Sequence, residues 1–240
     1  VKNWLDKLTE LKARKDTILN ALEKQEKLTP ELKARIESSW DSNEIEDIYL
    51  PYKPKRVTRA EMARKKGLEP LAKLIAAQKE PFLSGRVPAF VQGEVKDEEE
   101  ALSGARDIIA EWVNENERTR NQVRFAFRQA VISAKVIKGK EEEGAKYRNY
   151  FQFEEKLSRC QSHRLLAVRR GEEEGFLRVS IAPADDDACL ESLYRQYKRN
   201  NGACWEQFQL AIDDAYKRLL KPSIESEFAR SSKQKADEEA

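Results

Sequence analysis

The stretch "VKNWLDKLTELKARKDTILNALEKQEKLTPELKARIESSW", residues 1–40, decides the fold class. Its apolar side chains mostly recur at steps of three and four: Trp4, Leu5, Leu8, Leu11, Ile18, Leu19 and Leu22. This spacing predicts an amphipathic helix over residues 2–26. A second helix starts in "LTPELKARIESSW", where Thr29 is a good N-cap and Pro30 occupies the first helical position. We therefore expect a helical hairpin with its turn near residues 26–28.

Helical patterning continues along most of the chain. In "TRAEMARKKG", Thr58 and Glu61 form a capping box and Gly67 ends the helix. Residues 97–116 and 117–138 are predicted to be two long helices, or one helix with a bend near "NENE". Helices return from residue 189 onward, and Pro222 is expected to bend or interrupt the last of them.

Only residues 164–182, "RLLAVRRGEEEGFLRVSIA", resemble a sheet, with two short apolar runs around "GEEEG". The predicted fold class is therefore mainly α, a multi-helix array of helical hairpins with one small β-hairpin near 164–182.

The composition agrees with long, solvated helices. Of the 240 residues, 37% are charged and 40% are hydrophobic, and only nine are glycine. No run approaches the roughly 18 apolar residues of a membrane span, so no membrane partner is expected. The lack of a signal-peptide pattern and the odd number of cysteines, three, favour a cytoplasmic location. A start at Val1 and an end in helix-forming residues suggest a fragment of a longer protein.

The sequence contains one possible zinc site and one possible phosphate-binding loop, and the residue pattern argues against both. Cys160 and His163 form a C-x-x-H pair that Cys189 and Cys204 could complete as a zinc site, but the second pair is spaced too widely for a zinc knuckle. The stretch "GKEEEGAK", residues 139–146, has the glycine spacing of a phosphate-binding loop. It lacks the Lys-Ser/Thr that follows the second glycine, and its three glutamates would repel a triphosphate. We expect no metal and no cofactor.

Catalytic residues are equally hard to find. His163 is the sole histidine, and its neighbour Ser162 has no evident partnered acid. Asp185, Asp186 and Asp187 are consecutive, so their side chains fan outward and suit a helix N-terminus better than a metal-dependent nuclease. We therefore predict that the protein is not an enzyme.

Three basic clusters are the strongest functional signal. The first contains Lys53, Lys55, Arg56, Arg59, Arg64, Lys65 and Lys66. The second contains Arg118, Arg120, Arg124 and Arg128, of which the last three are spaced four apart and share a helix face. The third contains Arg159, Arg164, Arg169 and Arg170. Each cluster could neutralise phosphates without reading bases, and the alternative is a solvated surface paired with the many glutamates.

Four ordered blocks carry a family resemblance. They are "QEKLTPEL" (25–32), "EDIYLPYKPKRVTRAEMARKKGLEPLA" (46–72), "GKEEEGAKYRNYF" (139–151) and "SHRLLAVRRGEEEGFLRVS" (162–180). Together they closely resemble the bacterial Tex family of transcription accessory proteins, whose members carry an S1-type RNA-binding domain. The stretch from Ala184 to Gly202 matches the family pattern poorly, and the three cysteines are not part of it.

The resemblance implies a place in a larger protein. Residues 1–200 would be a Tex N-terminal-like helical domain that lacks the first helices of the family, and residues 201–240 a helical connector toward an absent RNase H-like domain. The implied function is a non-enzymatic scaffold in a protein that binds RNA or DNA, mainly through domains absent here. The candidate phosphate contacts are Lys53, Lys55, Arg56, Arg59, Lys65, Lys66, Arg120, Arg124, Arg128, Arg169 and Arg170. The alternative is a protein-interaction module that docks to the transcription machinery.

The stretch "DIYLPYKPKR", residues 47–56, is expected to join two helical hairpins. Pro51 and Pro54 restrict the backbone toward an extended course. We expect Tyr49 and Leu50 to pack inward and the cations that follow to stay in water.

Overall fold

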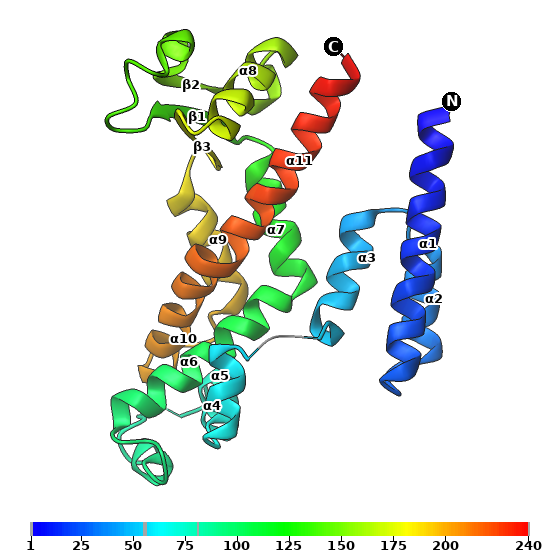
Figure 1. Cartoon of the computed structure of the whole chain (residues 1–240). Coiled ribbons are helices and arrows are strands. Elements are labelled where there is room, and N and C mark those ends of the chain that lie inside the picture. The colour runs from blue at the N-terminus through cyan, green and yellow to red at the C-terminus, as the bar shows by residue number, and fades with distance from the viewer. Residues whose placement is uncertain (1, 55–56, 81, 240) are drawn as a thin grey trace.

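A computed structural model describes residues 2–54, 57–80 and 82–239. The described chain is mainly helical with one small sheet (Figure 1). The first helices are α1 (Lys2–Lys24), α2 (Pro30–Ser38), α3 (Ser42–Tyr49), α4 (Arg59–Lys65), α5 (Glu69–Ala77), α6 (Glu98–Glu115) and α7 (Glu117–Phe127). The later helices are α8 (Ser162–Glu173), α9 (Asp186–Tyr197), α10 (Ala203–Asp214) and α11 (Lys221–Glu239). Short 3₁₀ segments are Leu50–Tyr52, Val87–Phe90, Ala145–Tyr150 and Leu157–Arg159.

Helices α1, α2 and α3 form an N-terminal unit with a hydrophobic core of its own. This core contains Ile18, Leu22, Leu32, Ile36, Ile45, Ile48 and Tyr49. The predicted hairpin is confirmed: Glu26 adopts a positive φ of 57° in the turn, and the Thr29 side chain accepts a hydrogen bond from the Leu32 amide. In Figure 1 the unit stands beside the rest of the molecule, which we call the body.

The body is built around α6, which contacts α4, α5 and α10. Its buried face carries Ala101, Ala105, Ile108 and Ile109. Thr58 caps α4 as predicted by accepting from the Glu61 amide, and Gly67 ends that helix with a positive φ of 76°. One continuous core joins these helices to the sheet and to residues as late as Ala236.

The sheet has three antiparallel strands, β1 (Val131–Val136), β2 (Gln152–Lys156) and β3 (Leu177–Ala182), in the order β2-β1-β3. Ile132 and Ala134 of β1 are fully buried, and Ile132 pairs with Ile181 of β3. The predicted class, mainly α with a small sheet, is confirmed.

Three strand positions differ from the prediction, and one of them is β2, which lies outside residues 164–182. Within 164–182, only the second half is a strand, because residues 162–173 form α8; its buried Leu165 and Val168 follow a helical spacing. The predicted helix over 117–138 ends at Phe127, and "VISAKV" alternates buried and more exposed residues as β1.

The last helices form one unbroken helical run from Ala203 to Glu239. The α-helical pattern is interrupted by a π-helical segment, Ala215–Leu220, in which the Lys221 amide donates to the carbonyl of Tyr216. This segment ends two residues before Pro222, which has no amide hydrogen of its own. Pro222 therefore does not break the helical run, and the change near it is one of helix type. None of the helices in the described ranges is both long and apolar enough to cross a bilayer.

Candidate nucleic-acid interface

The segment after α3 joins the N-terminal unit to the body. Tyr49 is buried in the core of the unit, as predicted, while Leu50 is half-buried. Tyr52 is also half-buried, and the Lys27 ammonium lies 6.0 Å from its ring centre. Lys53 is exposed and its backbone is extended. The aromatic residues of this segment therefore pack while the described lysine remains in water.

A groove of about 560 Å³ opens beside this segment, and we call it the connector groove. Its wall combines aromatic, basic and acidic side chains. Its charged and aromatic lining residues are Lys27, Tyr52, Lys53, Glu61, Arg64, Lys65, Glu111, Trp112 and Glu115. Because acids share the groove with the cations, a phosphate would be attracted mainly by the cations that no acid neutralises.

Members of the first basic cluster differ in whether an acidic side chain already pairs with them. Lys53, Arg59 and Lys65 are exposed, and none of them forms an ion pair with another described residue. Lys66 Nζ lies 2.5 Å from Glu100 Oε1, and this hydrogen bond raises the pKa of the lysine. The predicted contacts Lys55 and Arg56 lie outside the described residues.

The second cluster is largely structural. Arg120 Nε donates to Asp47 Oδ1 at 2.6 Å, and Arg124 donates to the same carboxylate. Both arginines also bond Glu227, at 2.9 Å from Arg120 and 2.7 Å from Arg124. We call these four side chains the Asp47 cluster.

The centre of the Asp47 cluster is buried, and its outer members Arg124 and Glu227 are half-buried. Asp47 and Arg120 are only 4–5% exposed, and Arg124 is 15% exposed. Burial by itself would lower the pKa of Arg124, but the hydrogen bonds to Asp47 and Glu227 outweigh burial and raise it. Because these guanidiniums are already satisfied by carboxylates, Arg120 and Arg124 are not placed to contact phosphate. For these two residues the phosphate role stays a prediction, and their pairing with Asp47 and Glu227 disfavours it.

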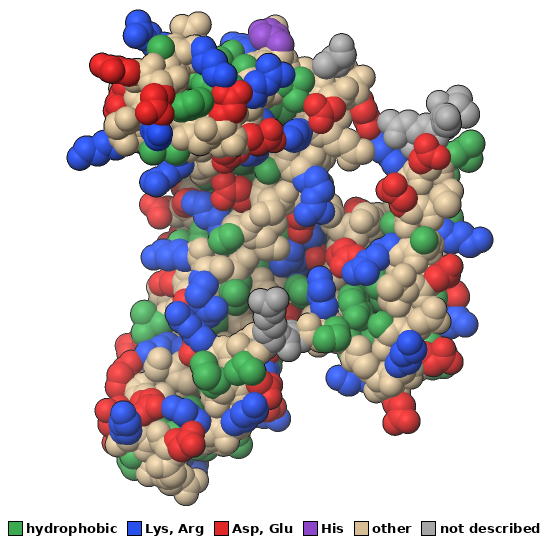
Figure 2. Space-filling model, viewed as in Figure 1, with side chains coloured by type: hydrophobic (Ala, Val, Ile, Leu, Met, Phe, Trp, Pro, Cys, Tyr) green, Lys and Arg blue, Asp and Glu red, His purple; other side chains and the backbone are tan. Residues whose placement is uncertain are grey.

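The other predicted phosphate contacts also comprise exposed cations and a cation that is paired with an acid. Arg128 is exposed, with its guanidinium 5.5 Å from the ring centre of the exposed Phe125. Arg169 is paired with Glu172 at 2.6 Å, whereas Arg170 is exposed. On the face shown in Figure 2, cations and acids are interspersed.

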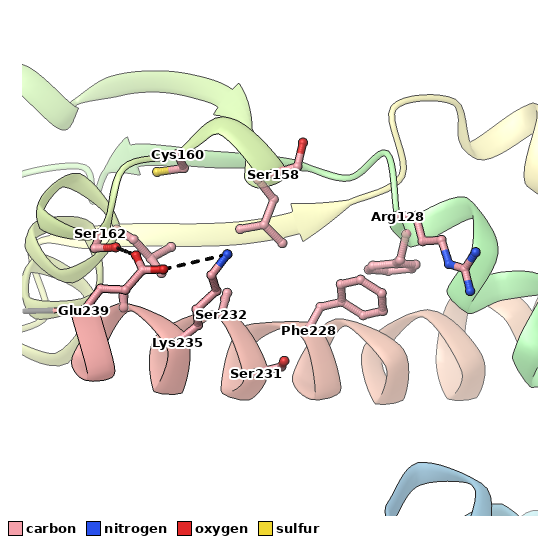
Figure 3. A pocket seen from close by; sticks show the side chains of 13 residues that line it. Arg128, Ser158, Cys160, Ser162, Phe228, Ser231, Ser232, Lys235 and Glu239 are labelled. Carbon is pink, nitrogen blue, oxygen red and sulfur yellow. Dashed lines mark hydrogen bonds and ion pairs between the residues drawn. The ribbon is translucent and has the colours of Figure 1, made fainter. Parts of the chain in front are cut away.

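A small cavity of about 230 Å³ lies between α11, the 3₁₀ turn before α8 and the start of α8 (Figure 3). Ser162 Oγ donates a hydrogen bond to Glu239 Oε2. Lys235 Nζ lies 3.8 Å from Oε1 of the same carboxylate. Burial raises the pKa of Cys160 to about 11, so its thiol stays protonated at neutral pH. The described lining residues include no histidine to activate the serine, so we assign no chemistry to this cavity.

The cysteines lie in separate environments. Cys189 and Cys204 are buried in the core of the body, and burial raises the pKa of both thiols. Zinc binding needs thiolates that converge. Among the described residues, no three or more His, Cys, Asp or Glu side chains are placed to hold a metal ion. The structure therefore does not bring the four residues of the considered zinc site together.

The aspartates after β3 are explained by local structure. Asp185 caps α9 by accepting from the Ala188 amide at 2.8 Å. Asp186 accepts a hydrogen bond from the Tyr216 hydroxyl at 2.7 Å and is paired with Lys221. The predicted helix N-terminus is confirmed at Asp185.

Sequence reasoning missed one group of cations, on the sheet. Lys135, Lys156 and Arg178 are exposed and come from three different strands. The missed signal is the alternation in "VISAKV", which sets Val131, Ser133 and Lys135 on one face of a strand.

Known proteins resemble this chain over nearly its whole length. Residues 84–240 match a family model described as Tex central region-like. Transcriptional accessory protein Tex of Neisseria gonorrhoeae is 34% identical over 244 residues, which cover 98% of this chain and 32% of that protein. Protein YhgF of Escherichia coli (strain K12) is 40% identical over 197 residues, covering 80% of this chain and 26% of its own length.

A more distant relative comes from Homo sapiens. It is named S1 RNA-binding domain-containing protein 1 and is 23% identical over 257 residues, covering 100% of this chain and 26% of its own length. The chain spans about a third or less of the length of these curated relatives.

Proposed function

The chain belongs to the Tex family, and from that premise we propose that it is a non-enzymatic scaffold within a nucleic-acid-binding transcription accessory protein. Its task is to hold the N-terminal unit and the body in one fixed relative orientation. We further propose that residues 201–240 connect this scaffold to the next domain of the full-length protein in the cytoplasm.

The observation that carries the scaffold role is the Asp47 cluster. The unit and the body have separate hydrophobic cores, so apolar packing within each core does not by itself fix how the two are oriented. Asp47 of α3 binds arginines of α7, and Glu227 of α11 binds the same arginines. A buried, multiply bonded charge cluster has demanding geometry, which favours one arrangement over many.

Two exposed ion pairs support the same orientation. Arg35 of α2 binds Glu117 of α7 at 2.6 Å, and Lys7 of α1 binds Glu238 of α11 at 2.6 Å. Exposed pairs of this kind contribute little energy, so the main contribution is expected from the buried cluster.

The connector groove is the proposed phosphate contact of this scaffold. Its exposed Lys53 and Lys65 have no acidic partner among the described residues, and Arg59 lies on the same helix as Lys65. Such cations neutralise phosphates without reading sequence. RNA and DNA would therefore bind alike, and the affinity for both would fall as the salt concentration rises.

A titration of this protein with fluorescein-labelled single-stranded RNA and DNA, at low and moderate salt, tests the contact. Lys53→Ala/Lys65→Ala should lower the magnitude of the negative slope of log K against log salt by about 1.4, because each phosphate contact to a single strand contributes about 0.7. The matched control is Lys12→Ala/Lys24→Ala, which removes two exposed lysines of α1. Equal slopes for the groove variant and the wild type would reject the groove as the contact.

A second candidate function is docking to the transcription machinery. It is favoured by the apolar stripe on α1, where Trp4 and Leu5 are 69% and 59% exposed, beside the 68% exposed Trp40. Trp4 and Trp40 border a groove of about 600 Å³. Titration of purified RNA polymerase against wild type and Trp4→Glu tests this candidate. The docking function requires that the wild type binds RNA polymerase and that Trp4→Glu does not.

A further inference from the structure

The strand register divides the sheet into two unlike faces. On β1, Ile132 and Ala134 point to one face and are fully buried, together with Ile181 of β3. The opposite face carries Val131, Ser133 and Lys135 with their cross-strand partners. We call this the open sheet face. Its partners are Gln152, Glu154 and Lys156 on β2 and Arg178, Ser180 and Ala182 on β3.

The open sheet face places two cations directly opposite each other. Lys135 of β1 is the register partner of Arg178 on β3, and both side chains are exposed. Neither forms an ion pair with another described residue. Like charges directly opposite in an antiparallel pair are destabilising. An anion bound between the two side chains would relieve this repulsion.

The remaining side chains of this face favour a phosphate as that anion. Gln152 lies opposite Lys135 on the other neighbouring strand, and Ser133 lies opposite Ser180 in the next row. Lys156 adds a third exposed cation, against one acid, Glu154. Lysine, arginine, serine and glutamine are the side chains that donate to phosphate oxygens in nucleic-acid complexes.

We propose that the open sheet face is a second, sequence-independent binding surface for the phosphate backbone of a single-stranded nucleic acid. This inference rests on the proposed function for the class of ligand. It is distinct in place, because it uses residues of β1, β2 and β3, whereas the connector groove is lined by the turn after α1, the segment after α3, α4 and α6. The face offers no exposed aromatic side chain for base stacking, so binding depends on the phosphates.

The test is a titration of the whole 240-residue chain with a short fluorescein-labelled oligothymidylate across a range of salt. Lys135→Ala/Arg178→Ala should lower the magnitude of the negative slope of log K against log salt by about 1.4, which corresponds to two lost phosphate contacts. The matched control is Lys217→Ala/Arg195→Ala, which also removes one exposed lysine and one exposed arginine. The control slope should stay within error of the wild type.

Three outcomes would overturn the proposal. A sheet variant with the slope of its control would show that the face does not contact phosphate. If only the Lys53→Ala/Lys65→Ala variant lowers the slope, the connector groove stands and the sheet proposal is rejected. If polyglutamate displaces the oligothymidylate at equal charge concentration, the face binds polyanions in general and the nucleic-acid assignment is wrong. A lowered slope for both variant pairs supports both sites.

Discussion

Arg120 of α7 and Asp47 of α3 form a hydrogen-bonded ion pair of 2.6 Å although they are 73 positions apart in the chain, and both side chains are almost fully buried. The pair lies where the N-terminal unit meets the body. Arg124 and Glu227 extend it into a cluster of two cations and two acids, so the buried charges balance. This balance is what makes burial of four charged side chains tolerable.

Asp47→Asn should destabilise the protein strongly. Asparagine keeps the shape and an acceptor but removes one negative charge, which leaves two buried arginines with Glu227 alone. Removing one partner of a buried ion pair costs about 3–5 kcal/mol. Urea unfolding followed by circular dichroism measures the loss.

The control for this prediction is Glu37→Gln. Glu37 forms an exposed i,i+4 pair with Lys33 at 3.9 Å, so its loss should change the free energy of unfolding by less than about 0.5 kcal/mol. An Asp47→Asn variant as stable as Glu37→Gln would mean that the cluster does not hold the structure together.

Gly171→Ala should also be destabilising, although alanine usually favours a helix. A Cβ at position 171 of α8 would lie 2.6 Å from Leu177 Cδ1 of β3 and 3.2 Å from Tyr147 Cδ1. Overpacking of this kind costs about 1–3 kcal/mol. Thermal unfolding of Gly171→Ala and Gly85→Ala tests this, because position 85 has open space around it. Equal melting temperatures would contradict the close approach of α8 and β3.

Alkylation of Cys160 should be slow at neutral pH. Its pKa of about 11, raised by burial and by Glu155, keeps the thiolate scarce, and the thiolate is the reactive form. The rate with iodoacetamide should rise with pH toward this value, as followed by mass spectrometry of the peptide that contains Cys160. A rate at neutral pH equal to that of an unstructured cysteine peptide would contradict it.

Asp107→Asn should stabilise the protein near neutral pH. Burial of this carboxyl raises its pKa despite Arg218, so the folded state holds the proton more tightly than the unfolded state does. Below the ordinary pKa of about 3.8 both states are protonated and no cost arises. The free-energy cost of ionising the buried carboxyl develops as pH rises and is complete above its raised pKa.

The free energy of unfolding of Asp107→Asn and wild type, measured from acid to neutral pH, checks the sign. The advantage of the variant should shrink as pH falls through the raised pKa and vanish at acid pH. A variant that is less stable than the wild type at neutral pH would contradict it.

Local features of the fold could be predicted from the sequence. Thr29 and Thr58 cap helices as their residue types indicate, and Tyr49 packs inward. Strand β1 was missed because no glycine or proline separates it from α7, so its short apolar run reads equally well as more helix. Apolar runs of this length do not distinguish strand from helix by themselves.

The candidate site was less predictable, because a cation can bind phosphate only if no acid pairs with it, and such acids can come from distant positions in the sequence. The four-residue spacing of Arg120 and Arg124 correctly placed them on one helix face, but their acids come from positions 47 and 227. No local pattern indicates such pairs. Lys53 was expected to be exposed, and it is.

The fixed orientation of the N-terminal unit on the body is tested most directly by a distance measurement. Spin labels are placed at the exposed positions Lys12→Cys on α1 and Lys217→Cys on the body, in a Cys160→Ser background that leaves the two buried cysteines in place. Double electron–electron resonance should give one narrow distance distribution, which broadens when Asp47→Asn is added. A distribution that is equally broad with and without Asp47→Asn would contradict a scaffold held by the Asp47 cluster.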